Sequence, residues 1–226
     1  MNELPEVYLN YGKSRFEPIF NPLRWIVNIC VFAYMAFYAY KSFSSTSNYF
    51  VFTIALMLGW ILGDAFTGLI HFFLDNFSFK RIPYLNKAAI LFQGHHIDPL
   101  GITRHPLSLV MFEPFVLVIL YHIILFKFVS DYNFGAPFTV AFTFVSGFSQ
   151  LSHRLSHSDS RIDVKPYLIT KVLRSLYLFV EPKHHSRHHF GDFSRNYAIG
   201  SGLTDKLMNH IYPEVKKFIF KFIVRV

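Results

Sequence analysis

The chain has 226 residues, of which 52% are hydrophobic and 16% are charged, and its formal net charge is +8. Average soluble domains carry about 25% charged residues, so this composition excludes a disordered chain and argues against a soluble enzyme. The single cysteine, Cys30, excludes an internal disulfide. Because the basic residues flank long apolar runs instead of covering a polar face, they predict contact with an anionic membrane surface and no nucleic-acid partner.

Four apolar stretches approach the roughly 20 residues that a membrane-spanning helix needs. They cover residues 25–40, 49–74, 107–129 and 134–151. A fifth stretch, 167–180, is interrupted by Lys171 and Arg174, which predicts a helix lying in the membrane interface. The basic and apolar segment 215–226 predicts either a membrane-surface segment or a terminal element packed on its own domain. Early Glu3 and Glu6, with no small-residue cleavage site, predict no signal peptide.

The distribution of positive charge predicts the orientation of these helices. Of the 22 lysines and arginines, all but Lys41 and Lys127 lie before the first stretch, between the second and third, or after the fourth. The positive-inside rule puts those three regions in the cytoplasm. We therefore predict one all-α, integral-membrane domain over residues 1–226, a bundle of about four transmembrane helices. A bacterial inner membrane and the endoplasmic reticulum fit this pattern equally well.

Ten of the 12 histidines fall in four short segments that this topology brings to the cytoplasmic face. One lies near the end of the second stretch, three lie in the loop that follows, two end the fourth stretch, and four form the motif HHSRHH. The ten are His71, His95, His96, His105, His153, His157, His184, His185, His188 and His189. Of the other two, His122 is interpreted as a hydrogen-bonded core residue and His210 as a surface or packing residue.

The spacing of the clustered histidines predicts metal binding. Residues three and four apart share one face of a helix, so the HxxxH pair at the end of the fourth stretch can aim both rings at one point. Three histidines of HHSRHH, at i, i+3 and i+4, can converge from a single turn in the same way. His71 and Asp75 have the same i, i+4 relation. Because imidazole suits zinc, copper, iron and nickel alike, spacing does not name the metal.

The number of histidines and the missing motifs restrict the kind of centre. Ten histidines exceed the four ligands of one tetrahedral zinc ion. The sequence has no HExxH motif, as a metalloprotease of that type would, and it lacks the two Glu-x-x-His pairs of a soluble carboxylate-bridged di-iron bundle. We therefore expect a dinuclear centre with all or nearly all ligands from histidine, at one membrane face.

Taken together, these segments resemble the plasmanylethanolamine desaturase family of integral-membrane lipid desaturases. The resemblance covers about residues 63–207 and rests on GDAFTGLIHFFLD, HHIDPLGITRH, HRLSH and KHHSRHH followed by NYAIGSGLTDKL, in the order of the family. The segments FQGHH and FSQLSH are also similar to the plastid-type desaturases that act on an acyl chain of phosphatidylglycerol.

This resemblance implies an O2-dependent desaturase with two iron ions. Because imidazole sites also accept zinc, zinc can substitute for iron in a purified sample. In the plasmanyl branch, such an enzyme forms the vinyl-ether bond of a plasmalogen from a 1-O-alkyl phospholipid. Asp75 and Asp98 are expected to orient ligand imidazoles or a bound water. His105 and His184 belong to the motifs, either as ligands or behind them. The ligands carried over by resemblance are His71, His95, His96, His153, His157, His185, His188 and His189.

Electrons for such a reaction must come from a partner. The sequence has no Rossmann GxGxxG motif and no cysteine set for an iron–sulfur cluster. Arg154, Lys183 and Arg187 are positioned in sequence to steer an acidic carrier such as cytochrome b5 or ferredoxin, or to contact lipid headgroups. Alternative functions are an acyl-chain desaturase, a lipid hydroxylase with the same centre, and a non-enzymatic metal-binding or metal-transport protein. The sequence does not assign an oligomeric state.

Overall fold

The structure is a computed structural model that describes residues 4–159, 167–190 and 193–222. The regular elements of these residues are all helices, as predicted, with no strand among them. In chain order they are α1 (Glu6–Leu9), α2 (Glu17–Ser45), α3 (Tyr49–Asn76), α4 (Pro83–Ile97), α5 (Gly101–Arg104), α6 (Leu107–Ile124), α7 (Phe126–Val129), α8 (Gly135–Ser158), α9 (Leu168–Ser175), α10 (Pro182–His189) and α11 (Asp205–Phe222).

Three of these helices, α2, α3 and α6, are long and apolar enough to cross a membrane. The helix α2 starts at Glu17, earlier than the predicted boundary, because Pro18 stands in its first turn, where a missing N–H costs no hydrogen bond. The third predicted stretch breaks at Leu125, which separates α6 from the short α7. The fourth stretch corresponds to α8, which continues to Ser158 and carries the HxxxH pair in its last two turns.

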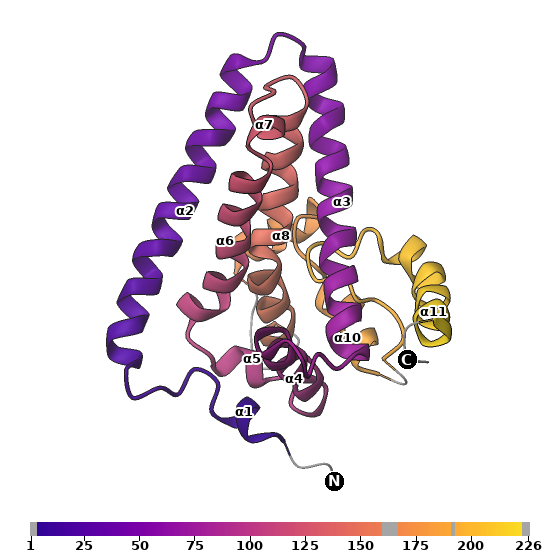
Figure 1. Ribbon diagram of the computed structural model, residues 1–226. Helices are drawn as coiled ribbons and strands as arrows, with labels where there is room; N and C mark the ends of the chain where they lie inside the picture. The colour runs from indigo at the N-terminus through magenta and orange to yellow at the C-terminus, as the bar shows by residue number, and fades with distance from the viewer. Residues whose placement is uncertain (1–3, 160–166, 191–192, 223–226) are drawn as a thin grey trace.

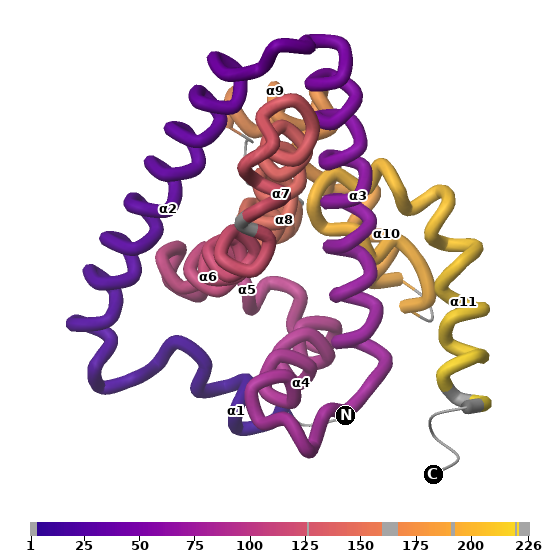
Figure 2. The backbone as a smooth tube through the Cα atoms, turned by 45° about the horizontal axis from the view of Figure 1, so that its top comes forward, coloured from indigo at the N-terminus to yellow at the C-terminus, as the bar shows by residue number. Residues whose placement is uncertain are grey.

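The long helices form a bundle that widens toward one end (Figure 1). The α2–α3 connection closes the narrow end, and α6 and α8 lie between these two helices. In both views α2 and α11 lie on opposite sides of the bundle (Figure 2). At the narrow end, Asn133 Oδ1 accepts hydrogen bonds from the backbone N–H groups of Ser47 and Asn48 at 3.0 and 3.2 Å. This contact joins the α2–α3 turn to the loop before α8.

Glycines on α3 allow it to pack closely against α8. A Cβ atom at Gly59 would lie 2.1 Å from the carbonyl oxygen of Phe138, and one at Gly63 would lie 3.0 Å from that of Phe142. Small residues of this kind let two membrane helices approach backbone to backbone. The same approach continues down both helices and brings the rings of His71 and His153 to 5.7 Å between centroids.

The wide end of the bundle collects the short helices α4, α5 and α10 with the last turns of α3 and α8 (Figure 1). His95 and His96 were expected in a loop, and this is wrong: they lie in the last turn of α4. Pro83 occupies the first helical position and no proline follows before Pro99, so the 15 residues of α4 are free to form a helix.

Many apolar side chains on the outside of the bundle are exposed, which suits a surrounding of lipid. On α2 alone the exposed fractions reach 54–70% at Ile19, Ile26, Ile29, Phe32, Phe37, Tyr40 and Phe43. The helix α9 likewise exposes Leu168, Ile169 and Val172, in line with the interfacial position predicted for residues 167–180. The C-terminal segment belongs mostly to α11, and its last four residues lie outside the described ranges.

Candidate metal centre

The structure brings eight of the ten clustered histidines together and divides them, with Asp75, into two groups that could each hold a metal ion. The five-histidine group consists of His95, His153, His157, His185 and His189. The Asp75 group consists of His71, Asp75, His96 and His188. Within each group, the candidate ligand atoms lie within 4.8 Å of one another. The groups adjoin, because the rings of His96 and His189 are 5.0 Å apart between centroids.

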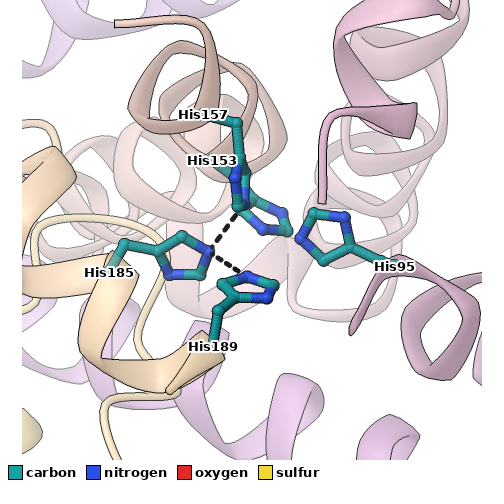
Figure 3. A group of neighbouring side chains, drawn as sticks. All are labelled: His95, His153, His157, His185 and His189. Carbon is teal, nitrogen blue, oxygen red and sulfur yellow. Dashed lines mark hydrogen bonds between the residues drawn. The ribbon is translucent and has the colours of Figure 1, made fainter. Parts of the chain in front are cut away.

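Three helices supply the five-histidine group (Figure 3). His153 and His157 are one turn apart on α8, and His185 and His189 are one turn apart on α10. His95, at the end of α4, faces both pairs, with ring centroids 4.6 Å from His153 and 4.7 Å from His189. The HxxxH pair of α8 therefore faces one point, as predicted. On α10, three histidines were predicted to converge, and only His185 and His189 do so, because His188 belongs to the Asp75 group.

Hydrogen bonding alone cannot account for the contacts at the centre of this group. Nε2 of His185 lies 3.0 Å from Nε2 of His157 and 3.1 Å from Nε2 of His189 (Figure 3). A ring nitrogen of neutral imidazole carries either one N–H or one lone pair, so it can complete only one of these two contacts. A cation bound by all three lone pairs at about 2.0–2.1 Å would account for all of them.

Two further histidines of the group have no other partner for their ring nitrogens. Among the described residues, neither nitrogen of His95 or His153 finds a hydrogen-bond partner, although only 5% and 2% of these residues is exposed. Buried polar atoms are normally hydrogen-bonded, and an orphaned one costs about 1–3 kcal/mol. Buried, unpartnered and convergent imidazoles are the arrangement expected of metal ligands.

The Asp75 group is built around one carboxylate oxygen. Oδ2 of Asp75 lies 3.2 Å from Nε2 of His71, and 3.1 Å from Nε2 of both His96 and His188. The predicted i, i+4 contact between His71 and Asp75 is therefore present. Because Asp75 faces the Nε2 atoms rather than the rear of each ring, its position suits a metal ligand better than the orienting role expected from the sequence.

Backbone carbonyls fix two of the three rings of this group, His71 and His188, from behind. Nδ1 of His71 lies 2.8 Å from the carbonyl oxygen of Tyr197, and Nδ1 of His188 lies 2.7 Å from that of Arg195. A carbonyl only accepts, so each Nδ1 carries the proton and donates it, and Nε2 of a neutral ring is left with its lone pair. Two lone pairs facing a carboxylate oxygen repel it unless a cation lies between them, so the donor set fits a metal.

Asp64 supports this arrangement and was missed in the sequence. Its buried carboxylate accepts hydrogen bonds from the backbone N–H groups of Ser201, Gly202 and Thr204 at 2.6, 3.0 and 2.9 Å, and from the Thr204 hydroxyl at 2.8 Å. These bonds hold the segment that follows Tyr197 against α3. The available signal was an acidic residue within an apolar span, which is expensive unless it has a role.

Burial keeps the histidines outside the long helices in the form that binds metal. It lowers the pKa of His95 and of His185 well below the usual histidine value, and the neighbouring His157 adds to the effect. The pKa of His189 falls to about 2, again because of burial first and His157 second. Neutral imidazole, the form with a free lone pair, is therefore present at neutral pH.

The structure leaves His105, His184 and Asp98 outside both groups. Nε2 of His184 lies 2.7 Å from Oδ2 of Asp205. The ring of His105 packs edge-on against that of Tyr11, with 4.8 Å between the ring centroids. Asp98 pairs with Arg104 at the end of α4 and contacts no ligand imidazole in the described contacts. Of its two predicted roles, orientation of a bound water stays a prediction. The motifs therefore include structural residues as well as candidate ligands.

The three basic residues considered for partner contact also differ. The guanidinium of Arg154 donates hydrogen bonds to the backbone oxygens of Ile102, Thr103 and His105 at 2.5–2.8 Å. These bonds hold the loop after α5, so Arg154 is not free to contact a partner protein. Lys183 and Arg187 are exposed on α10.

The two histidines outside the clusters behave as expected. Nδ1 of His122 lies 2.9 Å from the carbonyl oxygen of Val118 inside the bundle, and His210 is exposed on α11.

Comparison with known proteins agrees with the site. The lipid desaturase domain matches residues 60–223 of the chain. The chain is 28% identical over 174 residues to a plasmanylethanolamine desaturase of Myxococcus xanthus, covering 73% of this chain and 59% of that protein. It is 29% identical over 165 residues to the chloroplastic fatty acid desaturase 4 of Arabidopsis thaliana, covering 71% and 47%. No solved structure matches the chain.

A third relative, plasmanylethanolamine desaturase 1 of Mus musculus, is 26% identical over 161 residues, covering 66% of this chain and 57% of that protein. The chain thus spans about half to three fifths of the length of these relatives. The domain match includes every residue of the five-histidine group and the Asp75 group. This match and the predicted resemblance agree: the chain belongs to the lipid desaturase family, whose members include plasmanylethanolamine desaturases and plastid fatty acid desaturases.

Proposed function

We propose that the chain is an O2-dependent membrane lipid desaturase with one iron ion in the five-histidine group and one in the Asp75 group. The observation that carries this proposal is the pair of adjoining, buried ligand groups at one end of an apolar bundle. The most specific form of the proposal is formation of a plasmalogen vinyl ether from a 1-O-alkyl phospholipid. The similarity to plasmanylethanolamine desaturases of Myxococcus xanthus and Mus musculus supports it.

The overall reaction needs a strong oxidant and two external electrons. An alkyl ether, O2, two electrons and two protons give a vinyl ether and two water molecules. Bound iron would supply the O2 activation and the oxidising power that amino-acid side chains lack. The residues of this chain hold neutral imidazoles in place, keep bulk water away through their burial, and present apolar walls to a lipid tail.

The ligand set of each site follows from the two groups. The five histidines would hold one metal ion and leave room for an exchangeable ligand in the larger coordination shells that iron accepts. His71, His96, His188 and the Asp75 carboxylate would hold the other. Zinc is a chemically reasonable substitute in both, because imidazole accepts either metal.

The proposal includes a topology with four spans. The helix α8 would cross the membrane beside α2, α3 and α6, since it is 24 residues long and packs between them (Figure 1). The bias of lysine and arginine toward the histidine-rich end supports a cytoplasmic position for the site. The whole chain would act as one domain in the membrane.

An acidic electron carrier fits the surface beside the site. Lys183 and Arg187 are exposed on α10, the helix that also supplies His185, His188 and His189. A carrier with a negative docking face, such as cytochrome b5 or ferredoxin, would be steered toward this helix and would lie near both metals.

Lipid mass spectrometry tests the proposal. The full chain is expressed in a host that lacks plasmalogens but contains 1-O-alkyl phospholipids and an electron donor, with His185→Ala as the inactive control. We expect acid-labile vinyl ethers with the parent chain and none with the control. Unchanged ether lipids together with new acyl double bonds would instead support the acyl-chain reaction named for the Arabidopsis thaliana relative. Incorporation of an oxygen atom from O2 into the lipid product would identify a hydroxylase.

The same cells separate an enzyme from a metal transporter. A transporter would change cellular metal content and leave the lipids unaltered. The membrane spans offer few ionisable residues beyond those in the two groups and His122, whereas transport requires a polar route through the bilayer centre.

A further inference from the structure

The two histidines at the end of α4 lack support from other side chains. Neither ring nitrogen of His95 has a hydrogen-bond partner in the described contacts, and neither does Nδ1 of His96. His95 belongs to the five-histidine group and His96 to the Asp75 group, so α4 supplies one candidate ligand to each. Because these rings depend on the backbone that carries them, the contacts that hold the last turn of α4 also set the geometry of both groups.

The N-terminal segment 4–13 packs against this turn, and in both views α1 lies beside α4 (Figure 2). Tyr8 of α1 is only 6% exposed. A Cβ atom at Gly94 would lie 2.5 Å from Cδ2 of Tyr8, and one at Gly101 would lie 2.0 Å from its hydroxyl oxygen. The two glycines therefore form a notch between α4 and α5, the Gly94–Gly101 notch, and the side chain of Tyr8 fills it.

A hydrogen bond fixes Tyr8 in this notch. Its hydroxyl donates to the main-chain oxygen of Asp98, directly after the end of α4, at 3.0 Å. Burial, and after it the charge of Asp98, raises the pKa of Tyr8 to about 12, so the hydroxyl keeps its proton at neutral pH. Tyr8 thus contacts the end of α4 at two points, with its ring at Gly94 and its hydroxyl at Asp98.

The residues after α1 hold the segment in place. The ring of Tyr11 packs edge-on against that of His105, and its hydroxyl donates to Oε1 of Glu113 on α6 at 3.1 Å. Gly12 has a φ of +73°, which favours glycine, and a Cβ atom there would lie 3.2 Å from Cδ2 of Leu109. These contacts tie the segment to α6, so Tyr8 meets α4 from a fixed support.

The segment also forms part of a cavity wall beside the five-histidine group. Tyr8 and Tyr11 line the same cavity as His95 and His153. The match to the lipid desaturase domain begins at residue 60, so it assigns no role to the N-terminal segment. The structure nevertheless places two of its side chains next to candidate metal ligands.

From these contacts we infer that Tyr8 is a positioning residue for the metal centre. By filling the Gly94–Gly101 notch, it fixes the end of α4 and so aims His95 into the five-histidine group and His96 into the Asp75 group. Tyr8 acts through the backbone of α4 and does not itself contact a metal ion. The inference rests on the proposed function, in which both groups hold iron.

Titration with ferrous iron tests the inference without turnover, on the full chain in detergent and without oxygen. Tyr8→Ala should weaken binding of both ions by about 10–100-fold, as changes behind a ligand typically do. Tyr8→Phe keeps the ring in the notch and should stay much closer to the parent chain. Tyr38→Ala is the matched control and should bind both ions as the parent chain does. Tyr38 also donates to a main-chain oxygen, that of Val129, at the narrow end of the bundle (Figure 1).

A substitution in α4 tests the notch from its other side. The methyl group of Gly94→Ala would overlap the Tyr8 ring, so this variant alone should weaken iron binding as Tyr8→Ala does. In the double variant of Tyr8→Ala and Gly94→Ala, the methyl group occupies space that the ring has left. The second substitution should therefore add no further loss, whereas independent residues would give additive losses.

Amide hydrogen exchange of the metal-free chain measures the hold on α4 directly. Residues 94–98 should exchange faster in Tyr8→Ala than in the parent chain, and at the parental rate in Tyr38→Ala. Parental iron affinity in folded Tyr8→Ala, additive losses in the double variant, or unchanged exchange of residues 94–98 would overturn the inference. Failure of the proposed function is a separate result. The parent chain would then form no new double bond in any lipid, while exchange in the metal-free variants would still report whether Tyr8 holds α4.

Discussion

The Asp75 group and the five-histidine group lie side by side, yet the chain supports them differently. In the Asp75 group, the carbonyls of Tyr197 and Arg195 hold the Nδ1 atoms of His71 and His188. Asp64 in turn holds the neighbouring segment through four hydrogen bonds. Two of the three rings of this group are therefore fixed by the backbone before any metal binds, whereas neither ring nitrogen of His96 has a hydrogen-bond partner in the described contacts.

Four of the five histidines of the other group lack comparable support in the described contacts. Both ring nitrogens of His95 and His153, and the Nδ1 atoms of His185 and His189, have no hydrogen-bond partner there. These rings are positioned by helix packing and by one another, with centroid separations of 4.5–4.9 Å among neighbours such as His153 and His185. The Asp75 group is therefore preorganised by hydrogen bonds to the rear of its imidazoles, whereas the arrangement of the five-histidine group depends more on the metal itself.

The largest effect is expected from His185→Ala, which removes the ring whose Nε2 contacts two others in the five-histidine group. We expect this group to lose its metal and desaturation to fall more than about 100-fold, beyond the effect typical of second-sphere changes. Elemental analysis and lipid product assays measure both. His210→Ala, at an exposed histidine, is the matched control and should behave like the parent chain. Full metal content in His185→Ala would contradict the ligand assignment.

Asp75→Asn should affect the other group selectively. The amide keeps the shape of the side chain but loses the charge that three Nε2 atoms surround. We expect the bound metal to fall from two ions to one per chain, and activity to drop about 100-fold or more. Asp98→Asn removes a carboxylate that pairs with Arg104, and it should retain both metals. Equal metal loss in Asp75→Asn and Asp98→Asn would contradict the assignment of Asp75 as a metal ligand.

A smaller effect is expected at Asp64, which tests the preorganisation of the Asp75 group. Asp64→Asn leaves N–H groups of residues 201–204 without their charged acceptor. The free energy of unfolding should therefore fall by about 2–4 kcal/mol. Metal affinity of the Asp75 group should fall about 10–100-fold while the five-histidine group is affected less. Thermal unfolding in detergent and metal titration measure these effects. Asp131→Asn, in the loop at the narrow end of the bundle, is the control. An equal loss of metal affinity at both groups in Asp64→Asn would contradict preorganisation of the Asp75 group.

The smallest effect is expected at His184, inside the HHSRHH motif but outside both groups. The side chain of His184 is 30% accessible, whereas its partner Asp205 is fully buried and keeps its bond from the N–H of Ala198, so His184→Ala should lower the free energy of unfolding by about 1–3 kcal/mol. Metal content should remain at two ions per chain in elemental analysis. Loss of one ion in this variant would show that the motif contributes a ligand that the geometry does not indicate.

Much of the site was predictable from spacing because helical periodicity is local. The i, i+4 pairs His153–His157 and His185–His189 each share a face, so each pair contributes to one group. His188 was expected to converge with its neighbours and instead belongs to the Asp75 group. Successive helix positions differ by about 100°, so His188 and His189 point apart, and the sequence cannot say which side a second group occupies.

Other features depend on contacts between distant segments and could not be predicted in this way. The segment of Asp64 and the loop 201–204 are far apart in sequence, and the bonds between them form only when α3 packs beside that loop. Asp98 follows two histidines in the motif, yet its carboxylate turns to Arg104 at the helix end. The all-helical fold followed from the apolar runs, whereas helix α4 was missed because its polar, His-rich end resembles a loop.

Iron binding to the full chain decides whether the site holds two metal ions. The chain is loaded with excess ferrous iron without oxygen and then freed of loosely bound metal. The structure divides its ligands into two complete groups, so elemental analysis should give about two iron ions per chain, one for each of the two groups. A value of one ion or fewer per chain, in protein that remains folded, would contradict a two-metal centre.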